Sequence, residues 1–218
     1  IPLFIMAGTI MNRGKIAKPI VEIAELLLGH LRGGLSAASV VASAMFGAIS
    51  GSGAATLTCI GSIMMPHLRK AGYPEGISGA LVISASPLGL LIPPSAAQLL
   101  YAWIGQLSVL KCFLATVIPG LILTTMLIIV NFVILRNNNT IRITEIPDRF
   151  FKELGKKTAV ATPAILMPMI ILGGIYGGIM TPTEAAGVAV IYAIPVGFFV
   201  YRGLTITVFF ECLKESAI

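Results

Sequence analysis

Charged side chains are scarce in this sequence. They make up 11% of its 218 residues, whereas hydrophobic residues make up 56% and the mean hydropathy is +0.96. A soluble domain carries about a quarter charged residues, so this composition excludes an ordinary soluble protein and predicts a chain whose solvent is the lipid bilayer. The net charge of +6 does not indicate nucleic-acid binding, because the basic residues lie between apolar segments, as the positive-inside rule expects of membrane proteins.

Cysteine is also sparse. Cys59, Cys112 and Cys212 are scattered, with no CxxC motif and no histidine pair nearby, so we predict that they act as small hydrophobic residues. Glycine and proline are abundant instead, with 23 and 13 residues. Such numbers are typical of transporter helices that break or cross closely.

The two ends of the chain show no targeting pattern. The chain starts on an apolar stretch at Ile1 without an initiator methionine or a signal peptide, and a helical pattern still runs at residues 215–218. We therefore expect the sequence to be a fragment of a longer protein.

Hydropathy and basic residues divide the chain into distinct segments. We expect the end of a truncated transmembrane helix at 1–15, an interfacial arm helix at 16–33, a re-entrant hairpin at 34–71, a broken transmembrane helix at 76–106, a transmembrane helix at 110–135, a cytoplasmic basic loop with a short interfacial helix at 136–157, transmembrane helices at 158–180 and 182–202, and an amphipathic arm or the start of a further segment at 203–218.

The hairpin is predicted from a weak point between two basic ends. Residues 50–53 read Ser-Gly-Ser-Gly in the middle of an apolar stretch, a sequence that weakens a helix. Arg32 precedes the stretch, and Arg69 and Lys70 follow it. The positive-inside rule favours both ends on one side of the membrane, so the chain is predicted to enter and return rather than cross once.

The second weak point is Pro93-Pro94 within residues 76–106. Two prolines remove two backbone donors, which predicts a break at membrane depth, tolerated only inside protein or beside a water-filled cavity. Two simpler readings stay open: a close helix crossing at residues 50–53 and a plain proline kink. The occurrence of both breaks on either side of one turn favours a joint functional role.

Free backbone groups at membrane depth are what a transporter needs, since half-helix N-termini bind anions and unwound carbonyls bind Na⁺. The candidate binding groups are the hydroxyls of Ser50, Ser52 and Ser95 and the carbonyls of Gly89, Ile92 and Pro94.

Other polar residues are weaker candidates. His30 and His67 lie at basic edges, which favours surface roles over metal or proton-relay roles, and Glu184 is predicted to cap a helix with Thr181. Ser52 between two glycines suggests an intramembrane serine protease, but no second intramembrane histidine accompanies it.

Several strings resemble, in the same order, the large membrane subunit of TRAP (tripartite ATP-independent periplasmic) transporters. They cover essentially the whole chain and are PLFIMAG (2–8), MNRG (11–14), GHLRGGL (29–35), FGAISGS (46–52), KAGY (70–73), IPPS (92–95) and GGIMTPTEAA (177–186).

The resemblance implies an all-α polytopic membrane protein of the elevator type, built from two inverted repeats that each hold a re-entrant hairpin and a broken helix. This chain would hold the first hairpin, the first broken helix and the start of the second repeat. It implies a permease without enzyme activity or cofactor, in the bacterial inner membrane. That permease would import organic acids, such as C4-dicarboxylates or sialic acid, with Na⁺. Its partners would be a small membrane subunit, a periplasmic binding protein and the lipid bilayer.

The resemblance also implies a Na⁺ site at Ser50, Gly89, Ile92 and Pro94, with Ser52 adjacent. Thr56 stands where some relatives carry an acidic residue, so a Na⁺ ion here would rely on neutral oxygens. The competing hypothesis is another ion-coupled elevator-type carrier or exchanger that works without a binding protein.

Overall fold

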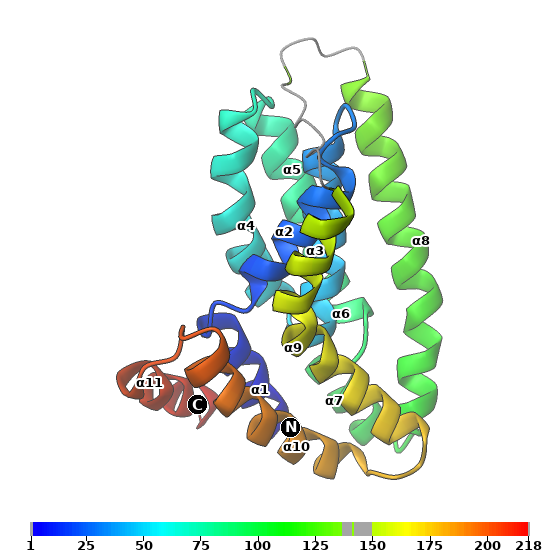
Figure 1. Ribbon diagram of the computed structural model, residues 1–218. Coiled ribbons are helices and arrows are strands. Elements are labelled where there is room, and N and C mark those ends of the chain that lie inside the picture. The colour runs from blue at the N-terminus through cyan, green and yellow to red at the C-terminus, as the bar shows by residue number, and fades with distance from the viewer. Residues whose placement is uncertain (1, 137–140, 142–149, 218) are drawn as a thin grey trace.

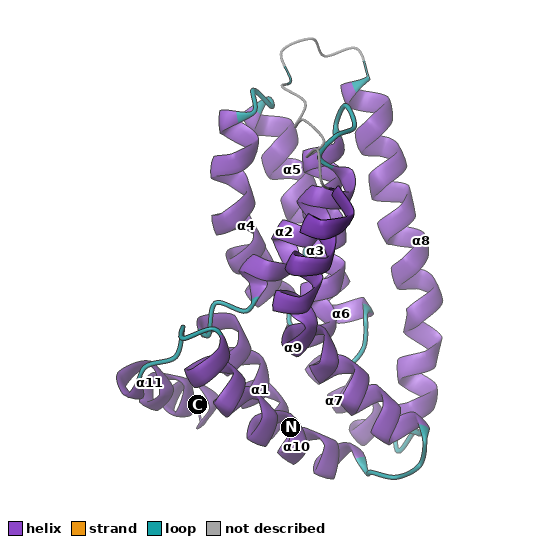
Figure 2. Ribbon diagram, in the orientation of Figure 1, coloured by secondary structure: helices purple, strands orange, loops and turns teal. Residues whose placement is uncertain are grey.

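The computed structural model describes residues 2–136, 141 and 150–217, and the elements in these ranges are all helices (Figures 1 and 2). In chain order they are α1 (Pro2–Arg13), α2 (Ala17–Leu28), α3 (Gly34–Ser50), α4 (Gly53–Lys70), α5 (Glu75–Ala85), α6 (Leu88–Leu91), α7 (Ala96–Ile104), α8 (Val109–Leu135), α9 (Phe150–Tyr176), α10 (Pro182–Pro195), the π-helical turn η1 (Val196–Val200) and α11 (Ile206–Ala217).

Three of these helical stretches are long and apolar enough to cross a membrane. They are α8, α9 and α10 with η1, and a fourth span results if α5–α6 and α7, bent by 46°, are one broken span. α8 stands at one side of the molecule (Figure 1) and exposes a row of large apolar side chains, as a lipid-facing helix does. This row includes Ile118, Leu121, Ile122, Met126, Ile129, Val130, Val133 and Ile134.

The stretch from residue 34 to residue 70 forms two helices that pack side by side. α3 ends at Ser50, and Gly51 then adopts a left-handed conformation with φ of +60°, which glycine accepts without steric cost. Ser52 caps α4 by accepting a hydrogen bond from the Ala55 amide at 3.4 Å. α4 runs back along α3 (Figure 1), which gives a helical hairpin; its re-entrant course through a bilayer stays a prediction.

The following stretch breaks twice rather than once. α5 ends at Ala85, the short α6 begins after Pro87, and α7 begins only after the cis Pro93–Pro94 bond. The additional break has the same local cause as the predicted one, because Pro87 also lacks an amide donor.

Three basic groups lie at one end of the molecule. The Leu35 amide donates to the Tyr73 hydroxyl at 3.3 Å, which joins the start of α3 to the α4–α5 turn. Asn131 near the end of α8 donates to the Gly33 carbonyl at 2.8 Å. Arg32, Arg69 with Lys70, and Arg136 therefore share this end, drawn at the top of Figure 1. Burial raises the pKa of Tyr73, so its hydroxyl stays protonated at this junction.

Arg202 is placed differently from the basic groups at that end. It precedes Gly203, whose Cα lies against the backbone of Gly14 and the side chain of Lys15. It therefore lies at the α1–α2 link, where α1, α10 and α11 pack together (Figure 1).

Two expected segments differ in the structure. The expected interfacial helix after residue 149 is not separate, because α9 runs unbroken from Phe150 through the expected membrane boundary at residue 158. The rest of that loop, 137–140 and 142–149, lies outside the described residues. The apolar stripe of the expected arm 16–33 is covered by protein: Ile20, Ile23 and Ala24 on α2 are buried, with α3 and α9 packed against the helix. Within the expected segment 203–218, residues Ile206–Ala217 form the amphipathic helix α11, packed on α1.

Asn131 should be a measurable source of stability. Its amide donates to the Gly33 carbonyl, and its Oδ1 accepts a hydrogen bond from Ser36 Oγ at 2.6 Å. Asn131→Leu removes both of these buried hydrogen bonds between α8 and the start of α3, so we expect the free energy of unfolding to fall by about 1–2 kcal/mol. Denaturant unfolding of the full-length protein in detergent measures this difference in the free energy of unfolding.

Thr125→Val on the same helix is the control, since Thr125 is exposed and bonds to its own helix at the Leu121 carbonyl. Equal unfolding midpoints for Asn131→Leu and wild type would contradict the expectation.

Candidate functional site

The two helix breaks lie against each other. Ser95 Oγ donates to the Gly51 carbonyl at 3.4 Å, across 44 positions of sequence. A Cβ atom on Gly51 would lie 2.8 Å from the Pro94 carbonyl oxygen. The tip of the α3–α4 hairpin therefore meets the α6–α7 break at the level of the backbone.

Glycine makes this approach possible. A Cβ atom on Gly47 of α3 would lie 2.7 Å from Gly89 Cα, and a Cβ on Gly89 would lie 2.7 Å from the Ser52 carbonyl and collide with Thr56 Oγ1. No real side chain fits at such distances, so both positions require glycine. The close packing holds α6 against the tip.

Three neutral oxygens meet beside Gly89. Ser50 Oγ lies 3.2 Å from Thr56 Oγ1 and 3.4 Å from the Ser52 carbonyl oxygen, and Thr56 Oγ1 donates to that carbonyl at 2.8 Å. Thr56 is almost fully buried and Ser50 is 9% exposed, so these oxygens are largely shielded from bulk solvent. We call these three atoms the oxygen cluster.

The structure brings most of the predicted site residues together. Ser50 and Ser52 contribute to the oxygen cluster, Gly89 lies against it, and Pro94 and Ser95 contact Gly51. Ile92 is different, because its side chain packs on Gly120 of α8.

Thr56 is the site residue that the sequence interpretation missed. It drew attention only as the position where a carboxylate is absent. A signal was available, because Thr56 lies four positions after Ser52, where a threonine hydroxyl can bond back to the carbonyl one turn earlier. What the sequence could not show is that this hydroxyl also reaches Ser50, across the bend between two helices.

The chemistry of the oxygen cluster suits a hard cation. Hydroxyl and carbonyl oxygens are ligands for such ions, and the C-terminal end of α3 adds the negative end of a helix dipole. Residues 34–70 contain no aspartate or glutamate, so a cation here would be held by dipoles alone. Among the described residues, no group of three or more His, Cys, Asp or Glu side chains could hold a metal ion.

A cavity of about 610 Å³ opens beside the hairpin tip. We call it the tip cavity. Its walls come from α1, the tip and the two sides of the α6–α7 break: Ile5, Gly8, Thr9, Asn12, Arg13, Ser50, Gly51, Ser52, Ala54, Ala55, Thr58, Leu90, Ala96 and Ala97. The first residues of α4 and α7 are among them, so the positive ends of two helices face the same space.

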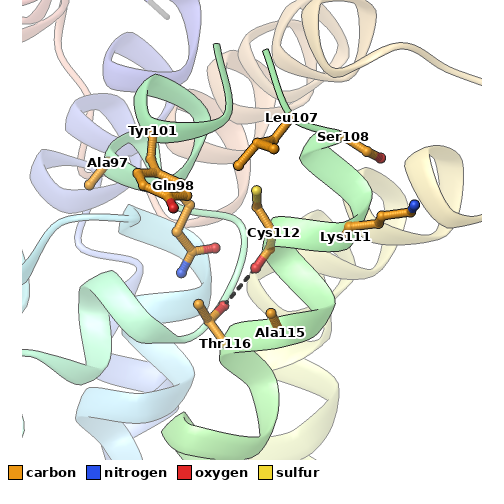
Figure 3. Close-up of a pocket in the computed structure, with 9 residues that line it drawn as sticks. All are labelled: Ala97, Gln98, Tyr101, Leu107, Ser108, Lys111, Cys112, Ala115 and Thr116. Atoms are coloured by element: carbon orange, nitrogen blue, oxygen red, sulfur yellow. Dashed lines mark hydrogen bonds between the residues drawn. The ribbon is translucent and has the colours of Figure 1, made fainter. Parts of the chain in front are cut away.

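A second cavity of about 510 Å³ lies between α7 and α8 (Figure 3). Its wall is mostly apolar, and the Lys111 side chain is directed away from the other lining side chains. Gln98 closes the side toward the α6–α7 break, where its Nε2 donates to the Leu90 and Leu91 carbonyls at 2.5 and 3.1 Å. These bonds pair two carbonyls that the proline break leaves without helical partners.

His67 and Glu184 have structural roles. His67 Nδ1 lies 2.7 Å from Glu25 Oε1 on α2, far along α4 from Ser52, which removes the residue that a serine protease would need. The predicted capping box is confirmed: Thr181 Oγ1 accepts from the Glu184 amide at 3.3 Å, and Glu184 Oε2 accepts from the Thr181 amide at 2.7 Å.

Long apolar helices, two broken helices and a polar pocket where the breaks meet define a membrane transport protein. The chain matches the family described as "Tripartite ATP-independent periplasmic transporter, DctM component" over residues 1–218, and it belongs to that family. It is therefore a multi-pass inner-membrane protein of the TRAP large-permease type, as the sequence resemblance indicated.

Curated relatives match the sequence over nearly the whole chain. The chain is 39% identical to the C4-dicarboxylate TRAP transporter large permease protein DctM of Pseudomonas aeruginosa, over 98% of its own length and 49% of the relative. It is 44% identical to the protein of the same description in Vibrio cholerae, over 94% and 44%. It is 36% identical to the sialic acid TRAP transporter permease protein SiaT of Haemophilus influenzae, over 100% and 35%. These relatives are named as transport permeases, not enzymes, and the chain spans about half of their length or less.

Gly89 offers a direct test of the close packing at the site. Gly89→Ala places a methyl group against the Ser52 carbonyl, so we expect the free energy of unfolding to fall by about 1–3 kcal/mol. Gly79→Ala in α5 is the matched control, because a Cβ there meets nothing within 4 Å and alanine favours a helix by up to about 1 kcal/mol. Thermal unfolding of the two full-length variants compares them. Equal destabilisation by both changes would mean that the α6–tip contact does not form.

Proposed function

We propose that the chain is part of the permease subunit of a Na⁺-coupled secondary transporter that imports organic acids delivered by a periplasmic binding protein. The observation that carries the proposal is the contact between the hairpin tip and the α6–α7 break, through Gly51, Pro94 and Ser95. Such breaks expose backbone dipoles at membrane depth, where ion-coupled carriers bind their ligands. The family membership and the named relatives support the substrate class.

In this proposal, Na⁺ binds at the oxygen cluster. Ser50 Oγ and the Ser52 carbonyl supply neutral oxygens, with Thr56 Oγ1 as a further one and the Gly89 and Pro94 backbones beside them. The implied contribution of Ile92 is restricted to its carbonyl, because its side chain faces α8. The C-terminal end of α3 favours the positive charge.

The acid binds beside the oxygen cluster, in the tip cavity, which Ser50 and Ser52 also line. The first turns of α4 and α7 line this cavity, and helix N-termini favour carboxylates through their unpaired amides and dipole. One bend of the chain thus presents a negative helix end to the cation and positive helix ends to the anion. In this proposal each ligand offsets part of the charge of the other, which would let a site without a protein carboxylate bind Na⁺ and would couple the movement of the two ligands.

Ser50→Ala tests the ion site. Loss of Oγ removes one ligand and the contact to Thr56, so we expect Na⁺-dependent uptake to be abolished while the protein still inserts into the membrane. The assay is uptake of succinate, N-acetylneuraminate, ectoine and isethionate by proteoliposomes that hold the full-length permease, the small subunit and the binding protein. Ser84→Ala is the control, since Ser84 is exposed on α5.

The same assay separates the competing functions. Normal uptake by Ser50→Ala would remove Ser50 from the ion site. Uptake by the wild type with the binding protein left out would favour the carrier that works without one.

A further inference from the structure

The charged side chain that lines the tip cavity is positive. Among the described residues that line it, Arg13 carries the only ionisable side chain, and no carboxylate faces it from the lining residues. Thr9, Asn12 and Thr58 add neutral hydrogen-bonding groups. An organic anion that leaves water for such a cavity needs a partner of opposite charge to offset its desolvation.

Arg13 is paired with a carboxylate of the protein. It is the last residue of α1, and its Nη1 donates to Glu211 Oε2 on α11 at 2.9 Å. α1 itself is packed on the hairpin tip, because a Cβ atom on Gly8 would lie 2.6 Å from the Ser50 carbonyl oxygen. The same short helix therefore contacts the tip with its middle and places a guanidinium at the cavity with its end.

Guanidinium chemistry matches the proposed cargo. An arginine carries five N–H donors in a planar fork, so one side chain can hold a protein carboxylate and a ligand carboxylate together. Bidentate pairs between arginine and a carboxylate are stronger and more directional than those that lysine makes.

Further positive charge lies next to Arg13. Lys15 and Lys18 line a neighbouring cavity of about 390 Å³, which shares Asn12 and Thr58 with the tip cavity. A cleft lined by one sign of charge raises the local concentration of ions of the opposite sign. The α1–α2 link thus makes a basic approach to the tip cavity.

We propose that Arg13 binds the anionic group of the transported acid, a carboxylate or a sulfonate, in the tip cavity, and that Glu211 of α11 pairs with the guanidinium. Lys15 and Lys18 attract the anion to the cavity. This inference rests on the proposed function and names the group that selects acids over neutral compounds. It also assigns a role to α11, which reaches the site through this ion pair.

The test is the kinetics of Arg13 variants in the full-length transporter. The probe is whichever of succinate, N-acetylneuraminate, ectoine and isethionate the wild type imports fastest. We expect Arg13→Gln to raise KM by about tenfold or more, the effect of losing a charge-assisted pair, while maximal rate and half-saturation by Na⁺ change little. Arg13→Lys keeps the charge without the fork and should give an intermediate KM.

Arg69→Gln is the matched control. It removes an arginine and breaks an ion pair, to Glu75 at 2.8 Å, at the other end of α4. Its KM should equal that of the wild type. Competition adds a second readout: a neutral amide analogue of the probe should compete poorly in the wild type and about as well as the acid in Arg13→Gln.

The remaining outcomes would contradict either the role of Arg13 or the proposed function. Unchanged KM in Arg13→Gln, or a loss of maximal rate alone, would overturn the role of Arg13 and leave the proposed function standing. If Arg13→Gln fails to reach the membrane, an Arg13→Lys variant with wild-type KM would overturn it equally. A wild type that neither imports nor binds any of the four probes, by calorimetry as well as by uptake, would overturn both.

Discussion

The structure depends on the direct backbone contact between the hairpin tip and the α6–α7 break. Broken helices leave amide and carbonyl groups unpaired, and each such group costs several kcal/mol in lipid. Here the two breaks contact each other, with Ser95 bonded to the Gly51 carbonyl. Within the α6–α7 break, Gln98 donates to the Leu90 and Leu91 carbonyls. Gly47 and Gly89 permit the contact because neither has a side chain to separate the helices.

This contact brings helix ends of both signs together. The end of α3 lies at the oxygen cluster, the beginnings of α4 and α7 line the tip cavity, and Ser50 and Ser52 belong to both sites. A cation and an anion can therefore bind a few residues apart without any buried protein carboxylate, whose desolvation would be costly. α1 completes the anion side with Arg13, which links the cavity to α11 through Glu211.

The breaks could be predicted from the sequence because their causes are local. Gly51 turns the chain at the residue where the Ser-Gly-Ser-Gly string stands, and α7 starts just after Pro93-Pro94. The packing partners could not be predicted in this way. α2 has the pattern of an interfacial helix, yet its stripe at Ile20 and Ala24 is buried in protein. α9 runs without a break from Phe150. The sequence could not predict this, because the apolar and charged residues around residue 157 are equally compatible with one helix or two. The course of residues 34–70 relative to a bilayer stays a prediction.

The composition alone determined that the chain is an apolar membrane protein, because solubility depends on residue type. The positions of glycine and proline determined where its helices are interrupted, because these residues weaken or break a helix. Only the tertiary structure decided which groups share the site. It placed the Thr56 hydroxyl beside Ser50, turned the Ile92 side chain toward Gly120, and set Arg13 at the cavity. These placements follow from how closely separate helices approach, which depends on the shapes of both partners and is not encoded in either segment alone.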